Sequence, residues 1–305
     1  MKLQLFTVDA FTDQPFSGNP AAVIPLTQVV EEEVLQRLAE ELNLSETAYV
    51  SPKATPPATT QEDPWVRCSR FTLRWFTPTT EVPLCGHATL ATAHVLFHCL
   101  GNLSSRLEFE TQSGVLVARR EGHHIVLDFP ANPPVPLTAL EETQLARLLK
   151  VVTGDLQVKH LLLSHTTKKL LVSLHACTRE QLETLQLDTG AILDLHDGSL
   201  VKGVIFTTRG TQTLASSTQA GELDPSEYHC VSRYFAPWNG IPEDPVTGSA
   251  HTVLGPYWSK ELGITTLRCR QCSARGGDVR VTVRPDGRVD LAGRATTLIQ
   301  GYITL

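Results

Sequence analysis

The sequence predicts an α+β fold made of two related domains, and three observations lead to this prediction. The chain has 305 residues, a length that corresponds, as a soft prior, to about two domains. Arg-Trp-Phe-Thr-Pro at residues 74–78 is echoed by Arg-Tyr-Phe-Ala-Pro at 233–237, an offset of 233 − 74 = 159. Predicted strands and helices do not alternate strictly, as they would in a doubly wound fold.

The repeated segment leads, in both halves, into a helix of small and apolar residues. The first spans residues 85–97 and opens on Cys-Gly-His; because it is apolar on all sides, we expect it to be a buried central helix. The same offset sets Cys85 against Asp244 (85 + 159), just before a second helix over 247–262. Each domain should therefore contain a strand, a proline-bounded turn and a central helix.

The other elements of the first half follow from apolar periodicity and turn residues. Residues 30–42 place their leucine and valine side chains on one face, which predicts an amphipathic helix that ends at Asn43. Residues 52–64 are rich in proline and threonine and predict a surface excursion. Strands are expected over residues 2–9, 21–25, 46–50, 65–76, 106–111, 114–120 and 124–129.

In the second half, residues 130–136 predict a linker because four of the seven are proline. The polar residues 208–226 predict a mobile loop, and Pro256 should kink or shorten the second central helix. Three late strands close the chain, with a Pro-Asp-Gly turn at 285–287 between two of them. The remaining predictions are helices over 138–151 and 178–187 and strands over 158–163, 168–174, 201–207 and 228–235.

Composition limits the classes of function. Hydrophobic residues make up 41% and charged residues 19% of the chain, so a sizeable core is expected. The net charge of −6 argues against nucleic-acid or anionic-membrane binding. No segment has the pattern of a signal peptide or a membrane span, so we expect a cytoplasmic protein. The seven cysteines, an odd number, are expected to be reduced, and the lone pair Cys269 and Cys272 to be structural rather than metal-binding.

Four short clusters contain residues capable of chemistry, and each also has a purely structural interpretation. Gly-Asn-Pro at 18–20 forms turns, and the acid in Ser-Glu-Thr at 45–47 can simply be solvated. Cys-Gly-His at 85–87 can hold a core histidine and an inert thiol, or a reactive thiol. Glu243–Ser249 precedes a helix, where acids often serve only as caps. Taken singly, each cluster is better explained by structure.

Taken together, the four clusters favour one active site. If the two halves are related by an approximate two-fold axis, both central helices can direct their N-termini, which attract anions, into one interdomain cleft. That cleft would also contain Glu46, His87, Asp244 and Ser249. Removing and returning a proton at carbon requires a base whose pKa is raised and an acid to oppose it, and carboxylates in a desolvated cleft supply both.

The same motifs resemble those of the phenazine-biosynthesis F-type isomerases, including the animal phenazine biosynthesis-like domain-containing proteins. The resemblance runs from end to end. Its motifs are Asp-Ala-Phe-Thr at 9–12, Phe-x-Gly-Asn-Pro-Ala-Ala-Val at 16–23, Asn-Leu-Ser-Glu-Thr at 43–47, Cys-Gly-His-Ala-Thr-Leu at 85–90, Glu-Asp-Pro-Val-Thr-Gly-Ser-Ala-His at 243–251 and Arg-Gly-Gly at 275–277.

The resemblance implies the fold of diaminopimelate epimerase: two pseudo-symmetric domains, each a mostly antiparallel sheet curled around a central helix. The expected domains are residues 1–120 with about 293–305, and residues 121–292. The resemblance also implies proton shuttling without a cofactor or metal, on a small carboxylate-bearing substrate. It assigns the principal acid/base role to Glu46, supporting roles to His87, Asp244 and Ser249, and substrate contacts to Asn19, Ser45, Gly86, Thr247, Gly248 and Gly276.

One departure concerns the pair of opposed cysteines that diaminopimelate epimerase uses. Cys85 stands at the first helix and Asp244 at the second, so two-thiol epimerisation is not expected. We interpret Cys85 as a bystander, with a second acid/base as the alternative. The resemblance also implies a homodimer. The alternative to an enzyme is a catalytically silent relative that binds a partner, such as a WD-repeat protein.

Overall fold

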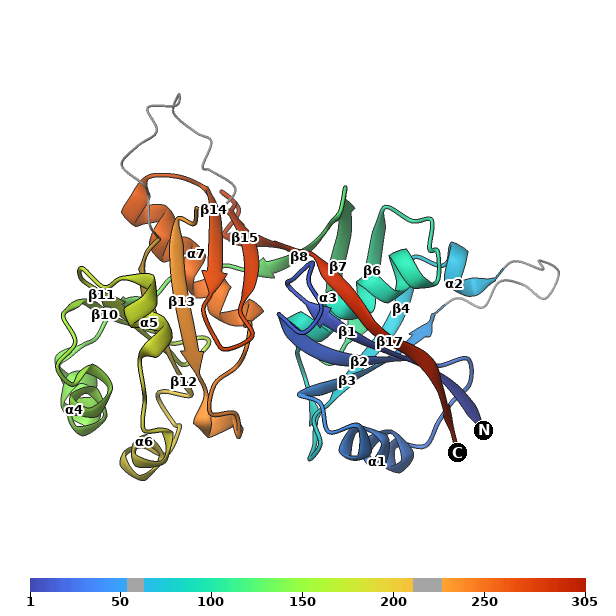
Figure 1. Cartoon of the computed structure of the whole chain (residues 1–305), viewed down its shortest axis with the longest axis horizontal. Coiled ribbons are helices and arrows are strands. Elements are labelled where there is room, and N and C mark those ends of the chain that lie inside the picture. Colours follow the sequence, from blue (N-terminus) through green and yellow to red (C-terminus); the bar gives the residue numbers. More distant parts are fainter. Residues whose placement is uncertain (54–62, 211–226) are drawn as a thin grey trace. The chain divides into compact units, whose positions relative to one another are not determined.

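The structure is a computed structural model that describes residues 1–53, 63–210 and 227–305. The chain divides into two compact units: unit 1 comprises Met1–Phe129 and Asp290–Leu305, and unit 2 comprises Pro130–Val289 (Figure 1). Most of the predicted surface excursion at 52–64 and of the predicted loop at 208–226 lies outside the described residues.

In unit 1 the strands pair in the order β17–β1–β2–β3–β4–β6–β7–β8. Neighbouring strands are antiparallel except for the parallel pairs β2–β3 and β4–β6. The strands are β1 (Lys2–Ala10), β2 (Asn19–Pro25), β3 (Glu46–Pro52), β4 (Arg70–Phe76), β5 (Glu81–Val82), β6 (Arg106–Thr111), β7 (Gly114–Glu121), β8 (His124–Pro130) and β17 (Ala295–Thr304). The helices are α1 (Glu32–Leu42), α2 (Pro64–Arg67), α3 (Gly86–His94) and the π-helix η1 (Val95–Cys99).

Unit 2 repeats this pattern of strand directions in the order β9–β10–β11–β12–β13–β14–β15. Its parallel pairs are β11–β12 and β13–β14, at the places that correspond to β2–β3 and β4–β6. The strands are β9 (Val135–Pro136), β10 (Val158–Ser164), β11 (Lys169–Leu174), β12 (Gly203–Arg209), β13 (Cys230–Phe235), β14 (Thr266–Gln271) and β15 (Gly277–Val283). Strand β16 (Arg288–Gly293) begins in unit 2 and continues into unit 1. The helices are α4 (Ala139–Thr153), α5 (Arg179–Thr184), α6 (Thr189–Leu195), the 3-10 helix η2 (Pro237–Asn239) and α7 (Gly248–Leu262).

Each unit contains a buried central helix, as the sequence predicted. In unit 1, every residue of α3 from His87 to Ala93 is buried, and the helix packs against β1, β2 and β3. Helix α1 covers the other face of the sheet, where Leu35 and Leu38 pack against Tyr49. Asn43 ends α1 in the left-handed conformation with a φ of 48°, so the predicted stop is confirmed.

Three predictions about single elements need correction. Residues 64–67 form helix α2 instead of the start of a strand, because Pro64 suits a first helical turn and Asp63 accepts a hydrogen bond from the Trp65 N–H (2.9 Å). The helix expected over 178–187 is present as α5 but already ends at Thr184, and the helix α6 that follows it was not predicted. Four late strands follow α7, not three.

Pro256 neither shortens α7 nor divides it: the helix runs through it for 15 residues. A proline cannot donate the hydrogen bond that the carbonyl four residues earlier would accept. Here that carbonyl belongs to Thr252, and it accepts the backbone N–H of Asn132 instead (3.0 Å). The linker residue Asn132 therefore supplies the hydrogen bond to the Thr252 carbonyl that Pro256 cannot donate.

The structure also corrects the offset of the internal repeat. Arg74 binds Glu81 through two hydrogen bonds of 2.7 and 2.8 Å, and Arg233 binds Glu243 through two of the same lengths. The arginines differ by 159, but the glutamates differ by 243 − 81 = 162. The strand-to-helix loop of unit 2 is therefore three residues longer.

The longer loop changes which residues correspond at the two helix starts. The N-cap of α3 is Cys85 and the N-cap of α7 is Thr247, again 162 apart. Cys85 is thus equivalent to Thr247, not to Asp244, and His87 is equivalent to Ser249. The repeat reads Pro-Leu-Cys-Gly-His-Ala at 83–88 and Pro-Val-Thr-Gly-Ser-Ala at 245–250. The absence of a matched cysteine pair still holds.

Among the helices that the described residues form, none combines the length and the apolar character needed to cross a membrane.

Candidate active site

The first group of candidate residues lies in unit 1, where β3 begins beside the N-terminus of α3. Glu46 is the first residue of β3, and its side chain points to the face of the sheet opposite Tyr49, because side chains alternate along a strand. His87 is the second residue of α3. Glu46 Oε2 lies 3.0 Å from His87 Nε2, and the two residues are only 9% and 6% exposed. The two sequence motifs therefore meet in one buried contact.

Ser45 shows that Nε2 of His87 bears a proton. Its hydroxyl donates to the carbonyl of Pro20 (3.0 Å), so its oxygen can only accept from His87 Nε2, which lies 3.1 Å away. Nε2–H thus faces two acceptors, the Ser45 hydroxyl and the Glu46 carboxylate. Glu46 Oε2 lies 3.0 Å from Nε2 but has no hydrogen-bond partner among the described residues. The contact between Glu46 and His87 is therefore electrostatic.

The other nitrogen of His87 faces Cys85 and Asn19. Cys85 Sγ lies 3.4 Å from Nδ1, and the side-chain nitrogen of Asn19 lies 3.2 Å from it. Asn19 is fully buried at the start of β2, after a loop in which Gly18 has a φ of +66°. A Cβ on Gly18 would lie 2.1 Å from the carbonyl oxygen of Ala10, so only glycine fits there. A thiol, an imidazole and a carboxylate thus form one buried cluster.

The pKa of Glu46 differs from what the sequence analysis led us to expect. We expected a catalytic carboxylate with a raised pKa. Burial alone would raise the pKa of Glu46, but His87, Ser45 and Cys85 outweigh burial and lower it. Burial alone would likewise lower the pKa of His87, but Cys85 and Glu46 raise it well above its usual value. Burial and Glu46 raise the pKa of Cys85 to about 11, so its thiol is protonated at neutral pH.

The same three residues could also hold a metal ion. One ligand atom from each of Glu46, Cys85 and His87 can be chosen so that all three lie within 4.8 Å of one another. A thiolate, an imidazole and a carboxylate are ligand types that zinc accepts. The chemistry proposed below needs no such ion.

The second group lies in unit 2, in the loop that leads into α7. The Thr247 hydroxyl donates to Asp244 Oδ2 (2.5 Å). Gln271, at the end of β14, holds this loop at two points: its side-chain nitrogen donates to the Asp244 carbonyl (2.6 Å), and its side-chain oxygen accepts from the Thr247 N–H (2.9 Å). Asp244 and Thr247 therefore have fixed positions at the start of the helix.

The other predicted residues of unit 2 surround this loop. Gly248 and Ser249 are the first two residues of α7, as Gly86 and His87 are of α3. Gly276 adopts a φ of +62°, and its N–H donates to Ser273, whose hydroxyl donates to the Pro245 carbonyl (2.8 Å). Asp244, Thr247, Gly248, Ser249 and Gly276 thus belong to one neighbourhood. That both groups serve one active site stays a prediction.

Two residues that the sequence analysis did not identify lie at or beside this loop: Gln271, which binds it directly, and Lys169, which contacts the ring of Tyr234, the residue whose carbonyl accepts the Asp244 N–H. Gln271 is fully buried, and Lys169 is 7% exposed. Neither stands in a recognisable motif. The sequence did contain a signal for Lys169, because this charged residue opens a mostly apolar strand, Lys-Leu-Leu-Val-Ser-Leu.

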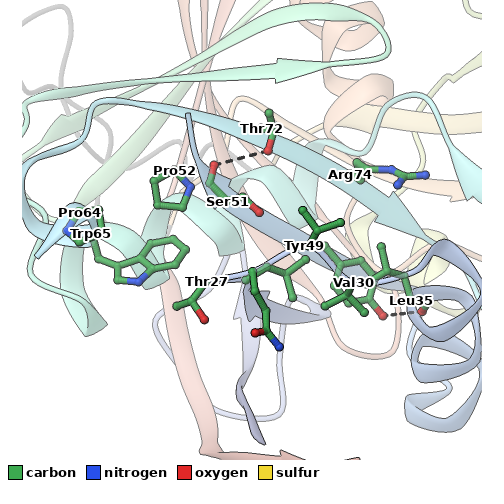
Figure 2. A pocket seen from close by; sticks show the side chains of 13 residues that line it. Thr27, Val30, Leu35, Tyr49, Ser51, Pro52, Pro64, Trp65, Thr72 and Arg74 are labelled. Carbon is green, nitrogen blue, oxygen red and sulfur yellow. Dashed lines mark hydrogen bonds between the residues drawn. The ribbon is translucent and has the colours of Figure 1, made fainter. Parts of the chain in front are cut away.

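A pocket of about 390 Å³ lies elsewhere in unit 1, on the face of the sheet that carries α1 (Figure 2). Pro64 and Trp65 lie at one end of it, and Tyr49, Val30 and Leu35 lie at the other. Its lining, among the described residues, does not include Glu46, Cys85 or His87. We therefore do not assign the chemistry to it.

Comparison with known proteins adds a family to this geometry. The family PhzC-PhzF, described as "Phenazine biosynthesis-like protein", matches residues 8–301. A phenazine biosynthesis-like domain-containing protein from Rattus norvegicus is 46% identical over 305 residues, covering all of both chains. A protein named as an uncharacterized isomerase from Pseudomonas aeruginosa is 40% identical, also over the whole of both chains.

Solved structures agree with the fold. A crystal structure of a phenazine biosynthesis protein of the PhzF family from Enterococcus faecalis is 35% identical and covers both chains completely, with a TM-score of 0.81. A predicted epimerase from Pseudomonas aeruginosa has the same fold at 21% identity, with a TM-score of 0.67 and 99% coverage of each chain. The predicted epimerase-like α+β fold is confirmed.

Proposed function

Because the chain belongs to the family of phenazine biosynthesis-like proteins, we propose that it is an isomerase that moves a proton on a small carboxylate-bearing substrate. An isomerase-type role is supported by two bacterial relatives that are named as isomerases and are 40% identical to this chain. The proposal that this isomerase uses acid–base catalysis depends on one observation: the buried contact between Glu46 and His87.

In this proposal Glu46 takes a proton from a carbon of the substrate and returns it, or another, at a different position. The lowered pKa of Glu46 keeps it ionised at neutral pH, so it is ready to act as the base. Once Glu46 holds the proton, the charge of His87 no longer has a partner, which favours release of that proton to the substrate. His87 thereby favours the ionised form of Glu46 both before proton transfer and after the proton has been returned.

The neighbours of this pair have defined supporting roles. Ser45 and Asn19 hold the two sides of the His87 ring. Gly86 offers its backbone N–H at the positive end of the α3 dipole, where a substrate carboxylate can bind. In unit 2 we assign substrate contacts to Asp244, Thr247, Gly248, Ser249 and Gly276.

Solvent-deuterium incorporation tests this proposal. The protein is incubated in D₂O with a panel of small carboxylates and with a metabolite extract, and mass spectrometry detects any metabolite that gains mass. Wild type should give a gain that Glu46→Gln abolishes. Glu33→Gln is the matched control, since it makes the same change on an exposed position of α1.

The outcomes separate the enzyme from the binding protein. A gain that survives Glu46→Gln would show that Glu46 is not the base. No gain with any metabolite, together with capture of a WD-repeat protein that Glu46→Gln leaves unchanged, would favour the silent relative.

A further inference from the structure

A buried lysine in unit 2 has fewer partners than its charge requires. Lys169 opens β11 and is 7% exposed. Among the described residues, its ammonium donates one hydrogen bond, of 3.5 Å, to the carbonyl of Thr167. An ammonium has three N–H groups, and burying a charge is costly unless it is paired. A further anionic partner would therefore stabilise the Lys169 ammonium.

The surroundings of Lys169 are arranged to hold a cation. Its ammonium lies 5.2 Å from the centre of the Tyr234 ring, within the range of a cation–π contact. The ring occupies the space over Gly203, the residue that pairs with Lys169 on β12, because a Cβ there would lie 2.2 Å from the Tyr234 hydroxyl. A glycine thus makes room for the aromatic ring, and the ring supports the lysine.

Lys169 also lies near the loop that leads into α7, because Tyr234, whose ring it contacts, accepts the backbone N–H of Asp244 at its carbonyl (3.0 Å). Burial lowers its pKa to about 8, while Asp244 opposes that effect. The amine is therefore mostly protonated at neutral pH. The carboxylate of Asp244 accepts a hydrogen bond from the hydroxyl of Thr247, which is the N-cap of α7. The ammonium and the positive end of the helix dipole therefore act on the same region.

The internal repeat shows that this region corresponds to the Glu46 site. Thr47 pairs with Phe76 in unit 1 and Val204 pairs with Phe235 in unit 2, and the two phenylalanines are repeat equivalents. Glu46 is therefore equivalent to Gly203. The residues paired with them across the parallel strands are Ala21 and Lys169. The end of the sheet that carries a buried carboxylate in unit 1 carries a buried ammonium in unit 2.

We propose that Lys169 binds a carboxylate group of the substrate at the N-terminus of α7. Thr247 makes no side-chain hydrogen bond that caps this helix, so the first backbone N–H groups are available to the same carboxylate. The inference rests on the proposed function for the class of substrate. It adds the residue that recognises the carboxylate.

NMR of protein labelled with ¹³C at the lysine ε-carbon tests this inference without any catalytic turnover. The Lys169 signal is assigned by its loss in Lys169→Arg. It should titrate near pH 8 in the free protein. Saturating malonate, used as a simple dicarboxylate probe, should raise that midpoint by at least about one unit, which corresponds to a tenfold preference for the ammonium.

Two variants complete the test. Lys169→Met should weaken malonate binding, measured by calorimetry, by roughly tenfold or more, and Lys169→Arg should restore part of it. Lys202→Met, on an exposed lysine just before β12, should leave binding unchanged. A wild-type Lys169 signal that malonate does not move would overturn the inference, even if Lys169→Met fails to fold.

The test is independent of the proposed function. Malonate binding through Lys169 without any deuterium exchange would support the inference and count against the isomerase. Exchange that depends on Glu46, with a Lys169 signal indifferent to malonate, would support the isomerase and contradict the inference.

Discussion

The carboxylate of Glu46 lies 3.0 Å from Nε2 of His87, and both side chains are buried. Glu46 begins a strand and His87 follows the first residue of a helix, so two separate backbone elements hold the pair. Ser45 reinforces the contact by accepting from the same nitrogen. The pair therefore contributes to stability as well as to the proposed chemistry.

The free energy of unfolding should depend on pH through this pair. The pKa of Glu46 is lowered from 4.5, so its contribution is present above pH 4.5 and is lost as pH falls further. The pKa of His87 is raised from 6.5, so its contribution is complete below pH 6.5 and is lost as pH rises through the folded value. The pair thus stabilises the fold most between pH 4.5 and 6.5.

Chemical denaturation of wild type and His87→Gln over a range of pH measures this effect. The difference in unfolding free energy between the two proteins should be largest in that window and should shrink towards alkaline pH. His175→Gln, at an exposed position, is the control and should show no such dependence. A difference that stays constant from acid to alkaline pH would contradict the ion pair.

Alkylation should find Cys85 unreactive at neutral pH. Its thiol is 6% exposed, and burial and Glu46 raise its pKa to about 11, so almost no thiolate is present. Iodoacetamide followed by peptide mass spectrometry should modify the more accessible Cys68 first. Cys85 should react only at strongly alkaline pH or after unfolding. Rapid labelling of Cys85 at neutral pH would instead favour its alternative role as a second acid/base.

Much of the fold could be predicted because apolar periodicity and special residues act locally. The all-round apolar pattern after Cys85 identified α3, and Asn43 identified the end of α1. The prediction that Pro256 shortens its helix was wrong because the effect of this proline depends on a distant residue: Asn132 supplies a hydrogen bond from the linker to the Thr252 carbonyl. Local rules cannot anticipate such compensation.

The candidate site was predicted only in part, for a similar reason. Glu46, His87 and Asn19 stand in motifs, and the structure brings them together. Gln271 gains its importance from a hydrogen bond to the Asp244 loop, and Lys169 from its burial against the Tyr234 ring. The offset of 162, which aligns the helix starts, was hidden because the strands match at 159.

Replacing Gln271 should destabilise unit 2. Gln271→Leu removes the hydrogen bonds to the Asp244 carbonyl, the Thr247 N–H and the Thr247 hydroxyl, and it leaves the buried Thr247 N–H without this acceptor. The expected loss is about 1–3 kcal/mol. Thermal and denaturant unfolding measure it, with Gln186→Leu on an exposed glutamine as the control. Equal stability of the two variants would show that the Asp244 loop needs no support from Gln271.

Adding one methyl group at Gly203 should disturb Lys169 through Tyr234. In Gly203→Ala the new Cβ would lie 2.2 Å from the Tyr234 hydroxyl, so the ring must move away from the ammonium that it supports. Overpacking of this kind costs about 1–3 kcal/mol. It should also shift the titration midpoint of the Lys169 NMR signal away from its wild-type value.

Gly301→Ala is the matched control, because it adds the same methyl group to a strand glycine that has nothing within 4 Å of the new Cβ. This variant should change neither stability nor the Lys169 signal appreciably. If Gly203→Ala lost stability but left the Lys169 midpoint where it was, the ring would be a packing element only. The properties of Lys169 would then have to come from burial and Asp244 alone.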